Sequence, residues 1–510
     1  MSDPSDAQLD DALERVAHGA TVSILAILFE KFVTFGLTAV LTNGFVASAY
    51  GLYALARRFQ RVPSSLAGGF MSGFPRYIPT ADTRAERDAM MTFGSVLLVS
   101  ISVLFGTSLT LAAPTLAALT DEGPQFVRFL ELCGIGLPAL VWLSTTGSLL
   151  RSFEEVGALN LSMRVVSPLA QLGVAAVGVV VFDSLVAVLI GTVAVNAILG
   201  VGFACWLGVK HDVRPRLLGD RGRETAVQFL RYTIPLFFTG FAYTTQQLGF
   251  YPLIAWFLSG TAGAVFVVGA LLGGFVRLPL TGINQFISPV ISTLHSDGHH
   301  EALDRLYQVT TRLVLVGATA IAVPMIVYRR ELLSVFGTEY TAFAALLPAF
   351  ILAQYAASAA GSVGFILTMT DHQKASLAIN GSVTALLVVV AVPLASWYGL
   401  PGVVTAYLLM NVLNNAAEVV GLYYLEGMQP FTRRHLSPLL AAIPFAGLGV
   451  LARTALGGTL GFAVGVLSGL FAYAVVIRLL GLSRVERRLA ATIADRYRTT
   501  IRDTMTSSAR

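Results

Sequence analysis

The chain has 510 residues, of which 55% are hydrophobic and only 12% are charged, and its mean hydropathy is +0.73. Soluble globular domains carry roughly 25% charged residues, so these values exclude a soluble protein and indicate an integral membrane protein. The net charge of +5 then reflects membrane topology rather than nucleic-acid binding, because cytoplasmic loops of membrane proteins are rich in Lys and Arg.

Residues 1–18 are polar and acidic and lack the basic start of a secretory signal, which predicts a cytoplasmic tail. Apolar segments then follow one another along the chain, each close to the ~20 residues that a spanning helix needs. We therefore predict an all-α polytopic membrane protein with about fourteen transmembrane helices. They lie at about 19–41, 50–79, 90–120, 126–150, 161–182 and 184–208, twice between 232 and 276, and at about 313–328, 343–369, 376–397, 400–424, 438–451 and 456–477.

An internal repeat organises these helices. The pattern Arg-x-Pro, followed by a hydroxyl residue, Phe and Ser, occurs at 61–72 and again, at one constant offset, at 277–288. An even number of predicted helices separates the two segments, so the repeat is parallel, as in transporters built from two related halves. The predicted domains are a tail 1–18, a six-helix bundle 19–209, a basic linker 210–231, a second six-helix bundle 232–425, an extra helix pair 436–480 and a basic cytoplasmic tail 481–510.

The basic residues orient the chain in the membrane. With the N-terminus inside, most of the Lys and Arg between the helices fall in inner loops, and only Arg128, Arg329, Arg330 and Arg453 fall outside. The positive-inside rule therefore predicts that both termini are cytoplasmic.

Three arginines, Arg57, Arg58 and Arg61, lie within the second predicted helix. A charge near the bilayer centre costs at least ~2.5–3.5 kcal/mol, so the three side chains either reach the headgroups or face a wet cavity. In a cavity they would capture an anion such as a phosphate, for which Arg offers a bidentate fork. The repeat pairs Arg61 with Arg277, which makes these two the best candidates.

Other polar residues within predicted helices have two interpretations each. Glu30 either pairs with an arginine of the second helix, which makes its burial tolerable, or it acts with Lys31 as a gate or coupling pair. Four amides either line a sugar-binding cavity or bond helices together, at ~0.6 kcal/mol per contact. These amides are Gln246, Gln247, Asn284 and Gln285.

The sequence offers no signal for an enzyme, a cofactor or a metal. It contains no GxxxxGK phosphate loop and no DxD motif, which argues against nucleotide hydrolysis and against a metal-dependent glycosyltransferase. Cys133 and Cys205 lie in apolar runs without CxxC spacing. His295, His299 and His300 fall in a short inner loop, which we interpret as solvated rather than metal-binding.

Several short segments give the chain a family resemblance. They are Tyr50-Gly-Leu-Tyr-Ala-Leu-Ala56, Arg76-Tyr-Ile-Pro79, Leu230-Arg-Tyr-Thr-Ile-Pro235, Phe336-Gly-Thr-Glu-Tyr340 and Tyr398-Gly-Leu-Pro-Gly-Val403. In order and spacing they resemble the multidrug/oligosaccharidyl-lipid/polysaccharide (MOP) exporter superfamily, and most of all its polysaccharide-biosynthesis, Wzx-like flippase branch. One departure is that the acidic residue often found in the seventh helix of relatives is replaced here by Gln246 and Gln247.

The resemblance implies a V-shaped pair of six-helix bundles and a monomer in the cell membrane. It also implies a flippase that moves a polyisoprenyl-phosphate-linked oligosaccharide outward, with that lipid and the membrane lipids as its partners. An antiporter of drugs or cations with the same fold is the alternative, although such a substrate favours an anionic cavity rather than an arginine-rich one.

Overall fold

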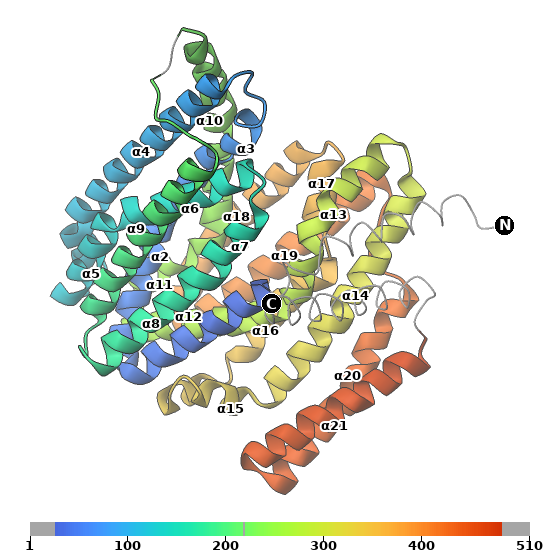
Figure 1. Cartoon of the computed structure of the whole chain (residues 1–510). Coiled ribbons are helices and arrows are strands. Elements are labelled where there is room, and N and C mark those ends of the chain that lie inside the picture. The colour runs from blue at the N-terminus through green and yellow to red at the C-terminus, as the bar shows by residue number, and fades with distance from the viewer. Residues whose placement is uncertain (1–25, 218–219, 482–510) are drawn as a thin grey trace, which may run out of the picture. The chain divides into compact units, whose positions relative to one another are not determined.

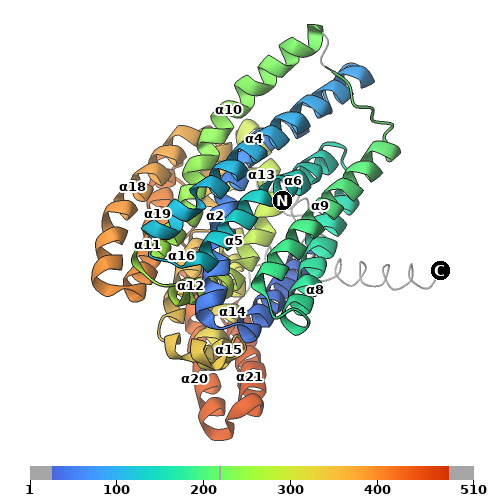
Figure 2. The same ribbon diagram turned by 90° about the vertical axis from the view of Figure 1, so that its left-hand side faces the viewer.

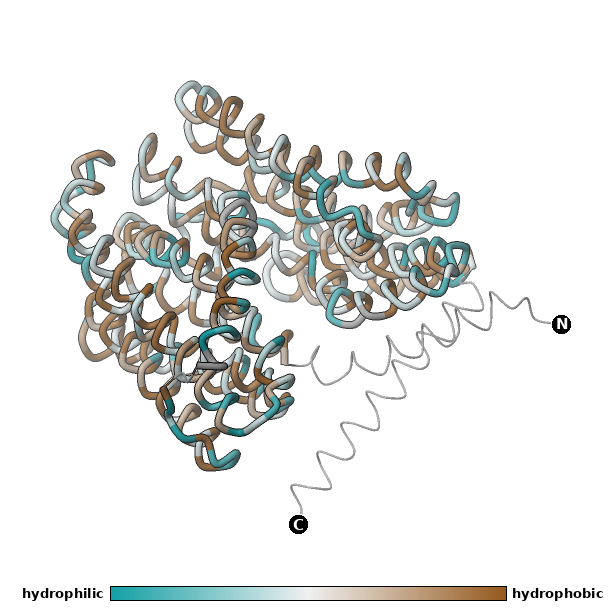
Figure 3. The backbone as a smooth tube through the Cα atoms, turned by 90° about the horizontal axis from the view of Figure 1, so that it is seen from above, coloured by the Kyte–Doolittle hydropathy of each residue, from teal (hydrophilic) through white to brown (hydrophobic). Residues whose placement is uncertain are grey.

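The computed structural model describes residues 26–217 and 220–481, and within these ranges the chain is helical and has no strand. The predicted tail 1–18, and the predicted tail 481–510 apart from Gly481, lie outside the described residues. Because the described residues form helices and no strand, the predicted all-α class is confirmed. Apolar residues run along most of the helices, as Figure 3 shows in brown.

Nine of the described helices are long and apolar enough to cross a membrane, and the number rises to twelve if each of three bent helix pairs is one span. Two further helices, α2 (Ala47–Met71) and α10 (Asp220–Leu248), are long enough to cross but carry several charges. With these two, the number of candidate membrane spans among the described residues reaches the predicted fourteen. The chain is a multi-pass membrane protein.

The described chain forms two compact units. The first unit comprises Phe29–Val268 and Ala391–Val403, and the second comprises residues 26–28, 269–390 and 404–481. The first unit contains most of the helix Ala26–Gly44 and then α2, α3 (Phe74–Tyr77), α4 (Arg84–Leu119), α5 (Pro124–Ile135), α6 (Leu137–Ser152), α7 (Val156–Asn160), the π-helix η1 (Leu161–Val166), α8 (Ser167–Val180), α9 (Leu185–Lys210), α10, α11 (Phe250–Phe257) and the first half of α12 (Gly260–Val276).

The second unit starts in the middle of α12. It contains α13 (Leu278–Ser296), α14 (His300–Val327), α15 (Arg329–Ser334), the 3-10 helix η2 (Thr338–Phe343), α16 (Leu347–Ala360), α17 (Val363–Met369), most of α18 (Gln373–Tyr398), most of α19 (Leu400–Glu426), η3 (Arg433–His435), α20 (Leu436–Leu456) and α21 (Gly458–Leu479). Figure 1 labels most of these helices.

Several predicted boundaries differ from the structure, and two of them have the same cause. The helix α10 begins at Asp220, inside the predicted linker 210–231, and α14 begins at His300 rather than near 313. Both helices start with a polar, charged turn that lies outside the apolar core of the span, so hydropathy alone places their starts too late. The division of the chain into domains at the linker stays a prediction.

Close backbone approaches hold α2 in the first unit. A Cβ atom at Gly51 would lie 1.6 Å from the carbonyl oxygen of Gly260, and one at Gly69 would lie 2.6 Å from the backbone of Phe237. Glycine is therefore required at both positions, as at other tight helix–helix crossings in membranes. These contacts fix the face of α2 that meets α10 and α12.

The two copies of the Arg-x-Pro pattern differ in local structure. Pro63 lies inside α2, which continues through it as one helix. In the second copy the chain bends by 59° between Gly260–Val276 and Leu278–Gln285, and Arg277 lies at the bend. The predicted repeat thus places its arginine within a helix in one unit and at a helix start in the other.

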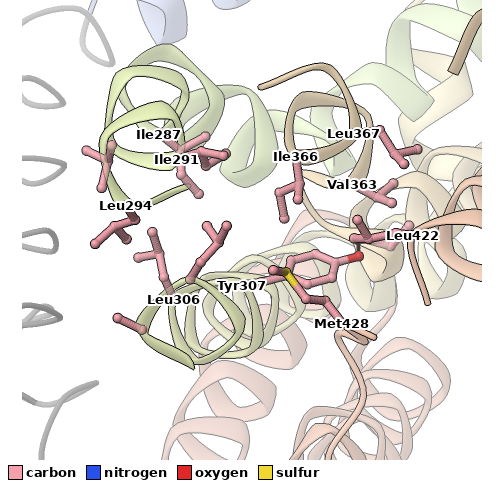
Figure 4. Close-up of a cluster of buried hydrophobic side chains, with 14 residues drawn as sticks. Ile287, Ile291, Leu294, Leu306, Tyr307, Val363, Ile366, Leu367, Leu422 and Met428 are labelled. Carbon is pink, nitrogen blue, oxygen red and sulfur yellow. Dashed lines mark hydrogen bonds between the residues drawn. The ribbon is translucent and has the colours of Figure 1, made fainter. Parts of the chain in front are cut away.

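The second unit has an apolar core at the ends of α13, α14, α17 and α19. Figure 4 shows Ile291 and Leu294 facing Leu306 and Tyr307, with Leu422 close by. The hydroxyl of Tyr307 donates a hydrogen bond to the carbonyl of Ala360 at 2.7 Å. This packing ties together helix ends that are far apart in the sequence.

The predicted last pair of helices is α20 and α21, which run side by side in Figures 1 and 2. They are joined to α14 by Arg312, whose side chain is only 2% exposed. Its guanidinium donates to the hydroxyl of Ser437 at 3.1 Å and to the carbonyl of Gly481 at 3.0 Å. Charged hydrogen bonds of this kind contribute about 1.5–3 kcal/mol each.

Candidate functional site

A cavity of about 240 Å³ lies within the first unit. The helix Ala26–Gly44, α2, α8 and α9 form most of its wall. The blue helix Ala26–Gly44 lies beside α8 in Figures 1 and 2, and Gly44 at its end packs closely on Val179. The polar residues of the wall are Glu30, Thr34, Thr38, Arg57, Arg58, Arg61, Ser167, Gln171 and Thr192.

All three arginines of the predicted cluster line this cavity. Positions 57 and 61 are four residues apart on α2 and therefore lie on one face of the helix, with Arg58 next to them. Arg57 and Arg58 are half-buried and Arg61 is exposed. The structure thus places the guanidiniums around a cavity, which is one of the two arrangements that the sequence left open.

Gln60 orients Arg57. The amide oxygen of Gln60 accepts a hydrogen bond from Arg57 Nη1 at 3.0 Å, and its amide nitrogen donates to the carbonyl of Cys133 at 2.6 Å. Gln60 is 1% exposed, so the fully buried amide links α2 to α5 while it holds the guanidinium. A buried amide with both ends bonded has a single orientation.

Tyr251 supports the second arginine. The guanidinium carbon of Arg58 lies 4.8 Å from the centre of the Tyr251 ring, which comes from α11 and is buried. Cation–π contacts of this kind contribute about 0.5–2 kcal/mol, depending on desolvation. They leave the edge of the guanidinium, which carries its N–H donors, available to a ligand.

The charges of the cavity favour an anion. Three guanidiniums face one carboxylate, that of Glu30, and among the described residues no carboxylate oxygen lies within 4.0 Å of the three arginines. Thr34 and Thr38 bond back to carbonyls of their own helix, at 2.7 and 2.9 Å. The cavity is therefore a cationic site with hydroxyl groups along one side.

The structure brings together only part of the predicted site. Lys31 is half-buried but does not line the cavity, and neither do Gln246, which is buried on α10, and Gln247, which is exposed there. Arg277 belongs to the second unit and is half-buried. The roles predicted for these residues stay predictions.

The two remaining amides, both on α13, also belong to the second unit. Asn284 accepts a hydrogen bond from the hydroxyl of Ser362 at 2.7 Å, which joins α13 to the residue that caps α17. Gln285 is exposed. For Asn284 the geometry agrees with the helix-bonding interpretation.

Several polar residues in and around the site were not predicted from the sequence, among them Gln60, Gln171 and Tyr251. Gln60 follows Arg57 by three positions, so helical spacing alone could have suggested the pair. Gln171, which donates to Ser167 at 3.1 Å, and Tyr251 come from distant helices. Only the folded chain brings them to the arginines.

Comparison with known proteins identifies the fold. No protein-family model matches the chain, and no curated protein matches its sequence. Among solved structures, the lipid II flippase MurJ in an inward closed conformation aligns with a TM-score of 0.71 and 13% identity, over 89% of this chain and 97% of that one. A multidrug resistance MATE family transporter in an inward-facing conformation aligns with a TM-score of 0.61 and 16% identity, over 82% and 93%.

A third neighbour is a MOP superfamily transporter from Pyrococcus furiosus, with a TM-score of 0.57 and 14% identity over 83% of this chain and 97% of that one. The binding pocket of that protein has reverse polarity, which suggests a different function for it. The chain therefore has the fold of the MOP superfamily, as its sequence predicted. Sequence identities of 13–16% show a common fold only. The substrate has to be inferred from the residues of the site.

Proposed function

We propose that the chain is a flippase of the Wzx-like branch that acts as a monomer in the cell membrane, with both termini cytoplasmic. It moves a polyisoprenyl-phosphate-linked oligosaccharide from the cytoplasmic to the outer leaflet, for cell-surface polysaccharide or glycoprotein assembly. It works by alternating access, is not an enzyme and uses no nucleotide. The observation that carries the proposal is the cavity in which Arg57, Arg58 and Arg61 face a single carboxylate.

The chemistry of the arginines suits a phosphate or diphosphate. A guanidinium donates two parallel hydrogen bonds to phosphate oxygens, and its charge strengthens them. Arg57 and Arg58 are each held by a neighbour, so less side-chain entropy is lost when they bind. Arg277, Gln246, Gln247, Asn284 and Gln285 are further proposed contacts, for which the sequence repeat and the amide chemistry are the support.

The size of the cavity indicates which part of the lipid binds there. At about 240 Å³ it is smaller than the ~300–1,000 Å³ pockets that enclose drug-sized ligands. It fits a phosphate head with its first atoms of sugar, but not a whole oligosaccharide. The glycan would therefore lie outside this cavity while the arginines hold the charged head.

The membrane potential supplies a driving force. Moving one negative charge outward, down an inside-negative potential, yields ~2.3 kcal/mol per 100 mV. A cationic cavity that loads the anionic head inside and releases it outside uses this drive. Glu30, with Lys31 beside it, is the proposed gate or coupling group, because its carboxylate competes with the substrate for the same guanidiniums.

The second candidate is an antiporter of drugs or cations. Glu30 in the cavity and the similarity to MATE transporters favour it. The excess of arginine opposes it, since a cationic substrate would face three positive charges. Efflux of a cationic dye from cells that express the protein, absent in a Glu30→Gln variant, would support the antiporter over the flippase.

The deciding experiment uses cells that lack this gene. Lipid-linked glycan is quantified on each face of the membrane, and the gene is restored as wild type, as Arg57→Ala plus Arg61→Ala, or as Arg61→Ala plus Arg277→Ala. Arg76→Ala is the matched control, because Arg76 comes from the same stretch of sequence but stacks on Tyr232, 4.2 Å from its ring centre, outside the cavity.

We expect glycan to accumulate on the inner face and to be cleared by wild type and by Arg76→Ala, but not by the double variants. If the Arg57→Ala plus Arg61→Ala variant clears the accumulated glycan, the cavity has no part in transport. If loss of the gene causes no accumulation, the flippase proposal is wrong.

A further inference from the structure

A histidine–carboxylate cluster lies in the second unit, apart from the arginine cavity. His295 is near the end of α13, His300 begins α14, and Glu426 ends α19. One ligand atom from each of the three residues lies within 4.8 Å of the other two. Nothing in the transport function proposed above uses them.

The cluster joins distant parts of the chain. A turn of three residues, 297–299, connects α13 to α14, and Gly298 in it has a φ of +75°, a conformation that glycine adopts without strain. The turn brings the rings of His295 and His300 to a centroid distance of 5.5 Å. Glu426 comes from more than a hundred residues further along and places its Oε2 atom 3.9 Å from His300 Nδ1.

We propose that His295, His300 and Glu426 bind a divalent transition metal, Zn²⁺ in the first place. Zn²⁺ takes imidazole nitrogen and carboxylate oxygen ligands at ~2.0–2.2 Å, so two ligands of a tetrahedral ion lie about 3.3 Å apart. The three side chains therefore need to close by about 1.5 Å at most. The side chain of His300 is 56% exposed and is free to make that adjustment.

His372 supplies the outer support that such sites need. Its Nε2 lies 2.7 Å from Glu426 Oε1, which leaves Oε2, the atom nearer to His300, for the metal. Carboxylate ligands of metal ions are usually hydrogen-bonded in this way, and loss of the outer partner typically lowers metal affinity 10- to 100-fold. The cluster thus has an outer partner before any metal binds.

His295 gives an independent indication. Its Nδ1 atom is buried and has no hydrogen-bond partner among the described residues. Buried polar side-chain atoms are bonded in the large majority of cases, and an unbonded one calls for an explanation such as an ion. An imidazole with an unused nitrogen beside a second imidazole and a carboxylate fits a metal ligand.

The scaffold holds these helix ends in place. Leu294 precedes His295, Leu303 follows His300 by less than one turn, and Leu422 is one turn before Glu426. All three leucines belong to the buried apolar cluster of Figure 4, where α13, α14 and α19 meet. The metal would therefore bind at ends that are already packed together, with the fourth ligand position open to water.

This site goes beyond the sequence-based expectation of a solvated loop without metal. That expectation rested on the spacing of His295, His299 and His300 alone, which matches no metal-binding motif. The ligand that completes the set, Glu426, and its partner, His372, come from other helices. Spacing along the sequence does not reveal such a set.

The test is metal binding to the purified full-length protein, in detergent and without an affinity tag. Zn²⁺ alone is titrated by calorimetry, and Co²⁺ alone is titrated by absorption, because tetrahedral Co²⁺ with nitrogen and oxygen ligands has intense visible bands. We expect one equivalent to bind. His295→Ala, His300→Ala and Glu426→Gln should each weaken binding at least tenfold, and His372→Ala about tenfold.

Two variants serve as controls. His299→Ala removes the neighbouring histidine that is not part of the cluster. His211→Ala removes a histidine that pairs with a carboxylate, Glu155, at 2.9 Å but belongs to no such cluster among the residues that the structure describes. Both should bind like wild type. His300 is exposed, so His300→Ala tests the site even if His295→Ala fails to fold.

The proposal is overturned if wild type binds no stoichiometric Zn²⁺, or if His300→Ala and Glu426→Gln bind it as wild type does. Because the readout is binding rather than transport, the outcome is independent of the flippase assignment.

Discussion

Arg58 lies over the ring of Tyr251, with its guanidinium carbon 4.8 Å from the ring centre. The contact joins α2 to α11 within the first unit, and the tyrosine is only 4% exposed. The ring therefore has one position, and the guanidinium that rests on it is held at the cavity. Arg58 is thus an arginine of the cavity whose orientation depends on an aromatic support.

The first prediction tests this support. Tyr251→Leu removes the ring and should weaken binding of a polyisoprenyl phosphate about fivefold, since an exposed to partly buried cation–π contact contributes about 1 kcal/mol. Tyr251→Phe keeps the ring and should bind like wild type within about twofold. The measurement is the Kd of purified protein for the labelled lipid, by fluorescence polarisation.

Trp256→Leu is the control for loss of an aromatic residue from α11, because Trp256 is 58% exposed and does not line the cavity. It should leave the affinity unchanged. Equal affinities for Tyr251→Leu and wild type would show that Arg58 does not contact the phosphate.

The sequence predicted the fold and the arginine cluster from signals of the same kind. Charges inside an apolar segment are costly enough to be visible without a structure, so Arg57, Arg58 and Arg61 could be identified by position alone. Helix number followed from hydropathy in the same way. Both signals are local in the chain.

The partners of these arginines, and the histidine cluster, depend on contacts across the fold. Gln60 bonds Cys133, 73 positions away, and His372 bonds Glu426, 54 positions away. No local pattern encodes such pairs. The π-helix Leu161–Val166, at the start of the helix predicted over about 161–182, was likewise not predicted from the sequence.

The second prediction concerns Gln60. Gln60→Leu leaves the buried carbonyl of Cys133 without its donor and should destabilise the protein by about 1–3 kcal/mol. It also releases Arg57, so lipid affinity should fall with stability. Melting in detergent and lipid Kd are measured together.

Gln60→Glu separates the two roles of this residue. A carboxylate still accepts from Arg57 but has no hydrogen to donate to Cys133, so this variant should lose stability and keep Arg57 in place. If Gln60→Leu melts like wild type, the bond to Cys133 contributes nothing measurable.

The third prediction is a pH dependence of stability. Glu155, in the loop before α7, lies 2.6 Å from Lys210 Nζ and 2.9 Å from His211 Nε2. The hydrogen bond from Lys210 and, to a smaller extent, the one from His211 hold the pKa of this carboxyl below its usual range. Because the pKa of Glu155 is lower in the folded protein than the value of about 4.3 in the unfolded chain, the ionised carboxylate stabilises the fold at any pH above about 4.3. This stabilisation is lost as the pH falls through the pKa of the folded state.

Glu155→Gln should therefore melt below wild type at pH 6–7, and the gap should close as the pH falls below about 4.3. The adjacent Glu154, which is exposed and has no ion-pair partner within 4.0 Å among the described residues, gives the control Glu154→Gln. It should show no gap at either pH. A gap that stays constant down to pH 3.5 would exclude the ion pair as its cause.

The fourth prediction concerns the crossing of α20 and α21. Glycines at 461, 465 and 469 repeat every fourth residue along α21, a pattern that lets membrane helices approach closely. Tyr328 packs against Gly465 and is only 1% exposed. Its hydroxyl donates a hydrogen bond to the carbonyl of Gly449 at 2.9 Å and lies 3.0 Å from the carbonyl oxygen of Gly461. A Cβ atom at Gly465 would lie 1.9 Å from this hydroxyl oxygen.

Gly465→Ala should therefore destabilise the protein by about 1–3 kcal/mol, the usual cost of overpacking, although alanine favours a helix. Tyr328→Phe removes the clashing oxygen and should by itself cost about 1 kcal/mol through its lost hydrogen bond. In the double variant the 1.9 Å clash is gone and the remaining contacts, to the ring carbon Cζ of Tyr328 and to Ala452 Cβ, are at 3.1 Å. The loss of the double variant should therefore be smaller than the sum of the single losses, which a double-mutant cycle of melting temperatures detects. Gly447→Ala is the control, because nothing lies within 4 Å of a Cβ there. Additive losses would mean that Gly465 is needed for some reason other than Tyr328.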